Sequence, residues 1–194
     1  MRNKFVCVLA GSAALLVSVS SALADSSGLP GDHGRLRDGI MPVNQAPPPP
    51  AGTAPRAMVR APAIELALQA AQAIVQGCSQ YALGVAVVNA QGAPTLIYIP
   101  DGSDSSHGYT AIRKAYTAIT FGTNTSELVS KGQQDADFAA KIKADPNLMA
   151  YGGGILLKAG DEIIGAIGVS GAEPGHHDEE CGLKGLEKIK NQLK

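Results

Sequence analysis

The stretch GGGILLKAGDEIIGAIGVSGAEPGHHDEECGLKGL, residues 152–186, decides how this chain is organised. It predicts a strand at 154–158, a tight turn at 159–161 and a second strand at 162–169. Glycine accepts the positive φ that tight hairpin turns require, so Gly160-Asp161 between two apolar runs indicates a β-hairpin. Two antiparallel strands therefore lead into a loop and an acidic helix start that carry His176, His177 and Cys181.

The beginning of the chain resembles a secretory leader. Arg2 and Lys4 precede an apolar run from Phe5 to Val19, and Ala22-Leu23-Ala24 matches a small-residue cleavage site. The apolar run is shorter than the roughly 20 residues that a membrane helix needs. We therefore expect a signal peptide at 1–24, cleavage after Ala24, and a periplasmic or secreted protein without a membrane span.

Composition narrows the choice of partners. Loss of Arg2 and Lys4 leaves 14 basic and 17 acidic residues, a formal net charge of −3. This balance and the lack of basic stripes argue against nucleic acid as a partner. Cys78 and Cys181 remain after cleavage, and in an exported protein they either form a disulfide or stay as buried thiols.

A proline-rich segment lies between the expected signal peptide and the expected folded domain. Residues 25–61 include four consecutive prolines and predict an extended, disordered tail or linker. His33 in this segment is either a solvated histidine or a mobile ligand for a site elsewhere. The folded domain is expected at 62–194.

The rest of the chain predicts an α+β domain. The pattern favours one antiparallel sheet with helices on both faces, because the strands at 84–90 and 94–99 are apolar without clean alternation. Further elements are expected as helices at 63–76, 109–121, 134–143 and 178–192. Asp104, Ser105 and Ser106 are candidate caps for the second helix, whose N-terminus suits an anionic group.

Four segments carry a family resemblance: GVAVVNAQGAP, DGSDSSHGYTAIRKAYTAITFGTNTSEL, GGGILLKAGDEIIGAIGVSG and HHDEECGLKGL. Together they resemble the GlcG/HbpS family, which also occurs as the C-terminal domain of PduO proteins. The resemblance covers residues 62–194. Asn89, Ser103 and the pair His176-His177 depart from the family pattern.

The resemblance implies a profilin-like fold with a five-stranded antiparallel sheet, and assembly into homo-oligomers, as dimers or larger rings. It also implies that the protein binds haem or a related tetrapyrrole, because some family members do so in exported sensor systems. We therefore expect haem b as cofactor and a role in haem sensing, storage or transport. The haem ligand is not a fixed residue of the family pattern, so it has to be inferred from this sequence.

His107 is the first candidate for the haem ligand, because histidine is a common axial ligand of haem iron. Arg113 or Lys114 can meet a propionate, and Tyr109 and Tyr116 can contact the ring. The alternative for His107 is a solvent-facing loop residue.

His176 and His177 are weaker candidates for a metal ligand. On a helix, His176 lies one turn from Glu180 and His177 one turn from Cys181, the spacing that aims two side chains at one ion. The simpler interpretation is that the acids stabilise the positive end of a helix. Cys181 is expected in the core or bonded to Cys78.

Two other classes of function remain open. The protein can be an enzyme acting on a small organic acid or aldehyde, with His107 or His177 as general base. It can also be an interaction protein that binds partners through the proline-rich segment. Ser170 lies in GVSGA, which lacks the last glycine of a nucleophile elbow, so it is expected to be a turn residue.

Overall fold

The computed structural model describes residues 59–194. The predicted signal peptide, residues 25–58 of the predicted proline-rich segment and His33 lie outside this range. The described chain forms, in order, α1 (Ile64–Gly77), β1 (Gly84–Asn89), β2 (Pro94–Tyr98), α2 (Ser105–Phe121), α3 (Thr125–Gln134), α4 (Ala136–Ala144), β3 (Gly154–Ala159), β4 (Glu162–Ser170), α5 (His176–Ile189) and a 3-10 turn, η2 (Lys190–Gln192).

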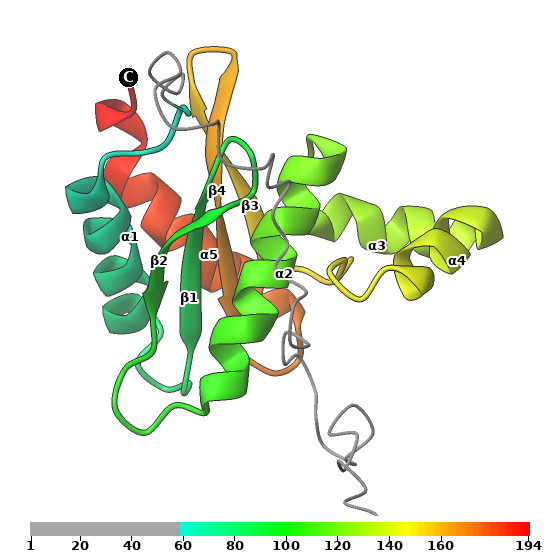
Figure 1. The fold of residues 1–194 in the computed structure, drawn as a ribbon. Coiled ribbons are helices and arrows are strands. Elements are labelled where there is room, and N and C mark those ends of the chain that lie inside the picture. Colours follow the sequence, from blue (N-terminus) through cyan, green and yellow to red (C-terminus); the bar gives the residue numbers. More distant parts are fainter. Residues whose placement is uncertain (1–58) are drawn as a thin grey trace, which may run out of the picture.

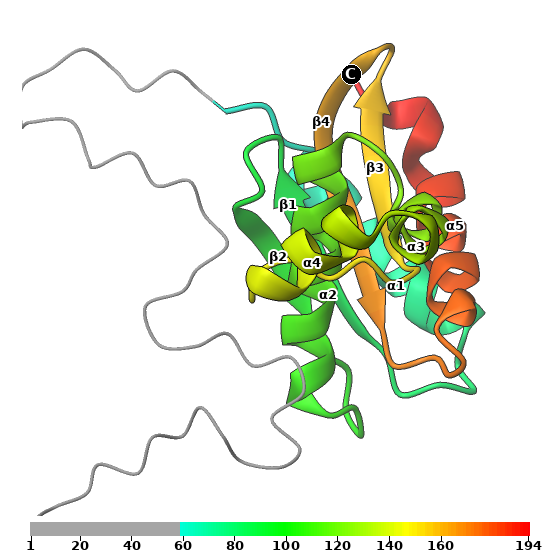
Figure 2. The ribbon, with the colours of Figure 1, turned by 90° about the vertical axis from the view of Figure 1, so that its right-hand side faces the viewer.

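All strand pairs are antiparallel, and the sheet order is β2-β1-β4-β3. β1 and β4 are central, with Val87 opposite Ile167. Helices α1 and α5 cover one face of this sheet and α2 covers the other, while α3 and α4 extend to one side of the domain (Figure 1, Figure 2). The α+β class and the antiparallel sheet between helices are therefore confirmed.

Alternate residues of the central strands face different helices. Val85 and Val169 pack in the large core with α1 and α5, whereas Ala86 packs with Ala111 of α2 on the opposite face. Burial on both faces explains why these strands carry apolar residues without alternation.

Helix α2 approaches the sheet closely. A Cβ added at Gly168 in β4 would lie 1.8 Å from the Ala111 carbonyl oxygen. Alanines on this side of the helix and glycine on the strand therefore allow backbone-to-backbone packing. Ala111, Ala115 and Ala118 are the buried small residues on this side of α2.

The five-stranded sheet implied by the resemblance is wrong for the described residues, because the sheet has four strands. Between α2 and β3 the chain forms α3 and α4, with polar residues on their exposed sides, and then an irregular stretch at 145–153. The profilin-like description stays a prediction.

Several helix starts differ from the prediction. Helix α2 begins at Ser105, because the Asp104 side chain accepts a 2.7 Å hydrogen bond from the Ser106 N–H. Helix α5 begins at His176 rather than Asp178, and α3 was not predicted at all. None of the helices among residues 59–194 is both long and apolar enough to cross a membrane.

A disulfide joins Cys78, directly after α1, to Cys181 in α5, with a Cα–Cα distance of 6.0 Å. The structure thus decides between the two alternatives that the sequence left open. Both cysteines are buried in the core between α1 and α5. The bond links the two helices that cover the same face of the sheet.

Candidate functional site

A buried ion pair lies at the end of β4. Lys114 of α2 is 3% exposed and Asp178 of α5 is 4% exposed. The Lys114 ammonium donates to Asp178 Oδ2 at 2.6 Å and to the Val169 carbonyl oxygen at 3.1 Å. The Ala172 N–H donates to Asp178 Oδ1 at 2.8 Å. The pair therefore connects helices that cover opposite faces of the sheet.

Burial and electrostatic attraction shift the pKa values of Lys114 and Asp178 in opposite directions. Burial raises the pKa of Asp178, and the nearby Lys114 ammonium and the Ala172 N–H oppose that rise. Burial likewise lowers the pKa of Lys114, against the attraction of Asp178 and Glu179. Removing either partner would leave the other charge buried without its counter-ion.

A pocket of about 680 Å³ opens beside this ion pair. Its walls come from the first half of α2, the segment before β3 and the loop between β4 and α5. The lining residues include Ser106, His107, Thr110, Arg113, Lys114, Met149, Tyr151, Gly171, Pro174 and Asp178.

His107 lies in the first turn of α2 and is half-buried. Gly84 packs against the backbone of His107, and Gly171 packs against its ring. A Cβ at Gly84 would lie 2.5 Å from the His107 carbonyl carbon, and a Cβ at Gly171 would lie 3.2 Å from His107 Cδ2. The His107 imidazole also contributes to the electrostatic environment of Asp178. The residue therefore lines a concave site instead of pointing into a free loop.

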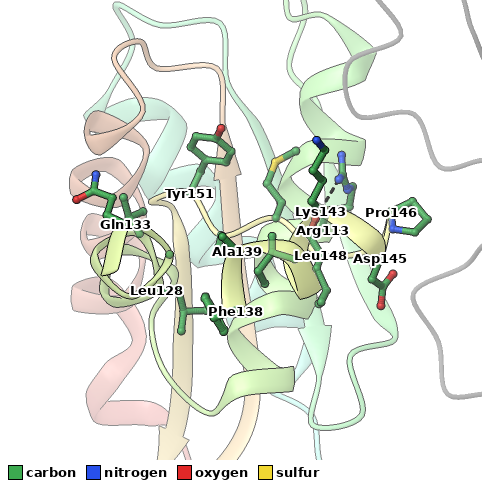
Figure 3. A pocket seen from close by; sticks show the side chains of 15 residues that line it. Arg113, Leu128, Gln133, Phe138, Ala139, Lys143, Asp145, Pro146, Leu148 and Tyr151 are labelled. Atoms are coloured by element: carbon green, nitrogen blue, oxygen red, sulfur yellow. Dashed lines mark hydrogen bonds between the residues drawn. The ribbon is translucent and has the colours of Figure 1, made fainter. Parts of the chain in front are cut away.

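Arg113 lies between the His107 pocket and a second, more apolar pocket of about 540 Å³. Figure 3 shows Arg113 beside Leu148, whose carbonyl oxygen accepts from the guanidinium at 3.0 Å. Burial lowers the pKa of Arg113, while Asp145 opposes this shift. Among the described residues, Arg113 Nε is buried and has no hydrogen-bond partner.

Tyr109 and Tyr116 lie on other sides of α2 and are not among the residues that line the His107 pocket. Tyr109 is 38% exposed. The ring of Tyr116 covers the β1–β2 turn, since a Cβ at Gly92 would lie 2.5 Å from its Cδ2. The structure thus brings His107, Arg113 and Lys114 together and separates the two tyrosines from them.

His176 and His177 lie at the start of α5 and do not themselves line the His107 pocket, although their chain neighbours Gly175 and Asp178 do. One ligand atom from each of these histidines and from Glu180 lies within 4.8 Å of the other two. Cys181 is buried and bonded to Cys78, as expected, so it is not available as a metal ligand beside His177.

Sequence reasoning missed the role of Asp178, which it treated only as an acid at a helix start. Lys114 and Asp178 are 64 positions apart, and no local spacing pattern connects them. Met149 and Tyr151 were also missed, because they lie in an irregular segment that only the fold brings to the pocket.

A family model described as "Haem degrading protein HbpS-like" matches residues 63–187. The chain belongs to the HbpS-like family. This confirms the resemblance to GlcG/HbpS proteins. A comparison with curated proteins gave no match.

Three solved structures illustrate how widely this fold is shared. Protein ORFY of Klebsiella pneumoniae is 23% identical, with a TM-score of 0.64 over 73% of this chain and 99% of that one. A double mutant of HbpS from Streptomyces reticuli is 29% identical, with a TM-score of 0.62 over 71% and 95%. A complex of PduOC with haem is 23% identical, with a TM-score of 0.61 over 66% and 95%.

Proposed function

We propose that this HbpS-like chain is an exported haem-binding protein that holds haem b in the pocket beside His107. The observation that carries the proposal is the half-buried His107 in a pocket of about 680 Å³. Family membership supports it, as does a solved relative in complex with haem. Haem sensing, storage or transport would follow from such binding.

The residues present fit a haem group. The pocket volume lies within the roughly 300–1,000 Å³ typical of small-molecule sites. Histidine is a frequent axial ligand of haem iron, so His107 would hold the iron. The Arg113 guanidinium would bind a propionate, since Arg pairs well with carboxylates and its Nε lacks a partner among the described residues.

Of the two residues considered for a propionate, Lys114 is less suitable than Arg113. Its ammonium is already bound to Asp178 and to Val169. Binding a propionate would require breaking a buried ion pair, so we assign the propionate contact to Arg113 and a positioning role to Lys114.

Bound haem would supply an iron centre for ligand binding or redox chemistry, and the protein would supply the pocket. The sequence contains no Cys-x-x-Cys-His segment, so the proposed attachment is non-covalent. The pocket opens to solvent, and we propose that a second copy of the chain covers it. We therefore retain the homo-oligomer as part of the proposal.

Titration of the purified, untagged protein with haemin tests the proposal. We expect a Soret band shifted from that of free haemin, which the His107→Ala variant weakens or loses. His176→Ala is the matched control, because His176 is exposed and outside the His107 pocket. No spectral shift with the native protein would refute haem binding.

The same experiment distinguishes other ligands and functions. If His107→Ala keeps the shift and His176→Ala or His177→Ala removes it, the haem lies at the start of α5 instead. A thermal-shift screen with small organic acids and aldehydes tests the enzyme alternative, because a ligand of the folded state raises the melting temperature.

A further inference from the structure

The first turn of α5 brings together three side chains that commonly bind metal ions. His176, His177 and Glu180 each offer one ligand atom within 4.8 Å of the other two. Along the helix, Glu180 follows His176 by four residues and His177 by three, so its carboxylate can reach both rings. The imidazole rings of His176 and His177 lie edge to face, with centroids 4.2 Å apart.

Tyr81 fixes one of these rings from outside the helix. Its hydroxyl lies 2.5 Å from His177 Nδ1, so Nε2 of that ring would be the ligand atom in a metal site. Histidine ligands of metals usually donate their other ring N–H to a carboxylate, a backbone carbonyl or a water, and this bond sets the tautomer and the ring orientation. In the metal-bound form His177 Nδ1–H would donate to the Tyr81 oxygen.

The disulfide holds Tyr81 in place. The Tyr81 N–H donates to the Cys78 carbonyl oxygen at 3.0 Å, and Cys78 is bonded to Cys181, one turn beyond His177. The partner of the histidine ring is thus connected to α5 by a covalent bond. Tyr81, His177 and the two cysteines are not among the residues that line the His107 pocket.

The local charges favour a cation. A helix N-terminus repels positive charge, but Glu179 and Glu180 lie in the same turn and offset this effect. Glu179 accepts from the Ser126 hydroxyl at 2.8 Å and from the Gly153 N–H at 3.1 Å. Glu180 is exposed and is the carboxylate within reach of both histidines.

We propose that His176, His177 and Glu180 bind a divalent transition-metal ion, with Zn²⁺ as the first candidate. Two imidazoles and one carboxylate form a ligand set that suits Zn²⁺, and a site with three protein ligands keeps one position open for water or another ligand. His176 and Glu180 also line a surface pocket of about 420 Å³, which gives that position access to solvent.

A tetrahedral ion about 2.0–2.1 Å from each donor needs donors about 3.4 Å apart. Closing the site from its present spacing therefore needs small side-chain rotations. His176 and Glu180 are exposed, and exposed side chains change rotamer within nanoseconds. The half-buried side of the site, where His177 contacts Tyr81, stays in place.

Co²⁺ is a suitable probe because its visible absorption reports ligand geometry. The experiment uses the full mature chain without a polyhistidine tag, without reductant, and without haem. We expect a Co²⁺ absorption band that saturates on titration and disappears when Zn²⁺ is added. His176→Ala, His177→Ala and Glu180→Gln should each abolish saturation, and His107→Ala should not change it.

Tyr81→Phe tests the orienting bond separately. It keeps the ring but removes the hydroxyl, and we expect a loss in Co²⁺ affinity of about 10–100-fold, the usual effect of such partners. Circular dichroism verifies that each variant is folded. An intact native protein that shows no saturable Co²⁺ band, or a band that the histidine variants leave unchanged, would overturn the proposal.

Haem binding is measured on the same variants, so the two proposals can fail separately. If haem binding is lost only in His107→Ala and Co²⁺ binding only in the α5 variants, both proposals stand. If the native protein takes up haem but no Co²⁺, only the metal site is refuted.

Discussion

The Lys114 ammonium lies 2.6 Å from Asp178 Oδ2 with both side chains buried. This contact fastens α2 on one face of the sheet to α5 on the other, beside the pocket that contains His107. A pair of this kind positions a site because neither residue can move without exposing or isolating a charge.

Lys114→Met should destabilise the fold by about 3–5 kcal/mol, because it leaves the Asp178 carboxylate buried without its cation. Asp178→Asn should also destabilise the fold, because it leaves the Lys114 ammonium buried without its counter-ion. The double variant should cost less than the sum of the two single variants, since it leaves no lone charge. Urea denaturation at neutral pH measures all three, and strictly additive losses would contradict the proposed coupling.

The cost of Lys114→Met should depend on pH. Burial already raises the pKa of Asp178 above its ordinary value of 3.8, and Lys114 limits that rise. Without Lys114, the pKa of Asp178 in the folded state rises further. At a pH between the unfolded and folded pKa values, Asp178 is then protonated in the folded variant and ionised in the unfolded chain. A carboxyl group whose pKa is higher in the folded state stabilises the fold at low pH. This stabilisation is lost as pH rises through the folded pKa.

The loss of stability in Lys114→Met, relative to the native protein, should therefore be smaller near pH 5 than near pH 8. Denaturation midpoints at both values provide the measurement. Lys158→Met, at an exposed position in β3, is a control that should show no such dependence. Equal losses at both pH values would mean that Asp178 stays charged without Lys114.

Replacing both Cys78 and Cys181 by alanine should lower the free energy of unfolding by about 2–4 kcal/mol. The bond closes a loop between positions 103 apart, so its loss frees many conformations of the unfolded chain. Denaturation of the native protein with and without reductant gives the same comparison. The prediction fails if reductant leaves the unfolding midpoint of the native protein unchanged.

Gly168→Ala should destabilise the domain by about 1–3 kcal/mol, because the new methyl group would lie 1.8 Å from the Ala111 carbonyl oxygen. Gly132→Ala in α3 is the matched control. An added Cβ there meets nothing within 4 Å, so we expect stabilisation of about 0.5–1 kcal/mol from helix propensity. Thermal unfolding of both variants would decide the sign of each effect.

Arg113→Gln should weaken haem affinity by about tenfold, the effect of losing one hydrogen bond to a charged group. Tyr116→Phe should leave haem affinity unchanged, because Tyr116 packs on the β1–β2 turn and does not line the His107 pocket. Haemin titrations followed in the Soret region compare the two. A stronger effect of Tyr116→Phe would favour the ring contact that the sequence indicated.

Much of the fold followed from local patterns. The turn at Gly160-Asp161 joins β3 and β4 as predicted, with Gly160 at φ 62°, and the Asp104 cap begins α2. These features depend on residues close together in the chain, where glycine conformation and capping act directly. Helix α3 was not predicted, because its sequence, TSELVSKGQQ, is mostly polar and includes a glycine.

The sequence by itself determined the family, the α+β class and His107 as a candidate ligand, because short motifs and apolar periodicity carry that information. Only the tertiary structure decided that Cys78 meets Cys181, that Lys114 is bound to Asp178, and that Tyr81 reaches His177. These contacts join residues 64 to 103 positions apart. Packing of α1, α2 and α5 around the sheet sets such distances, and no local spacing along the chain encodes them.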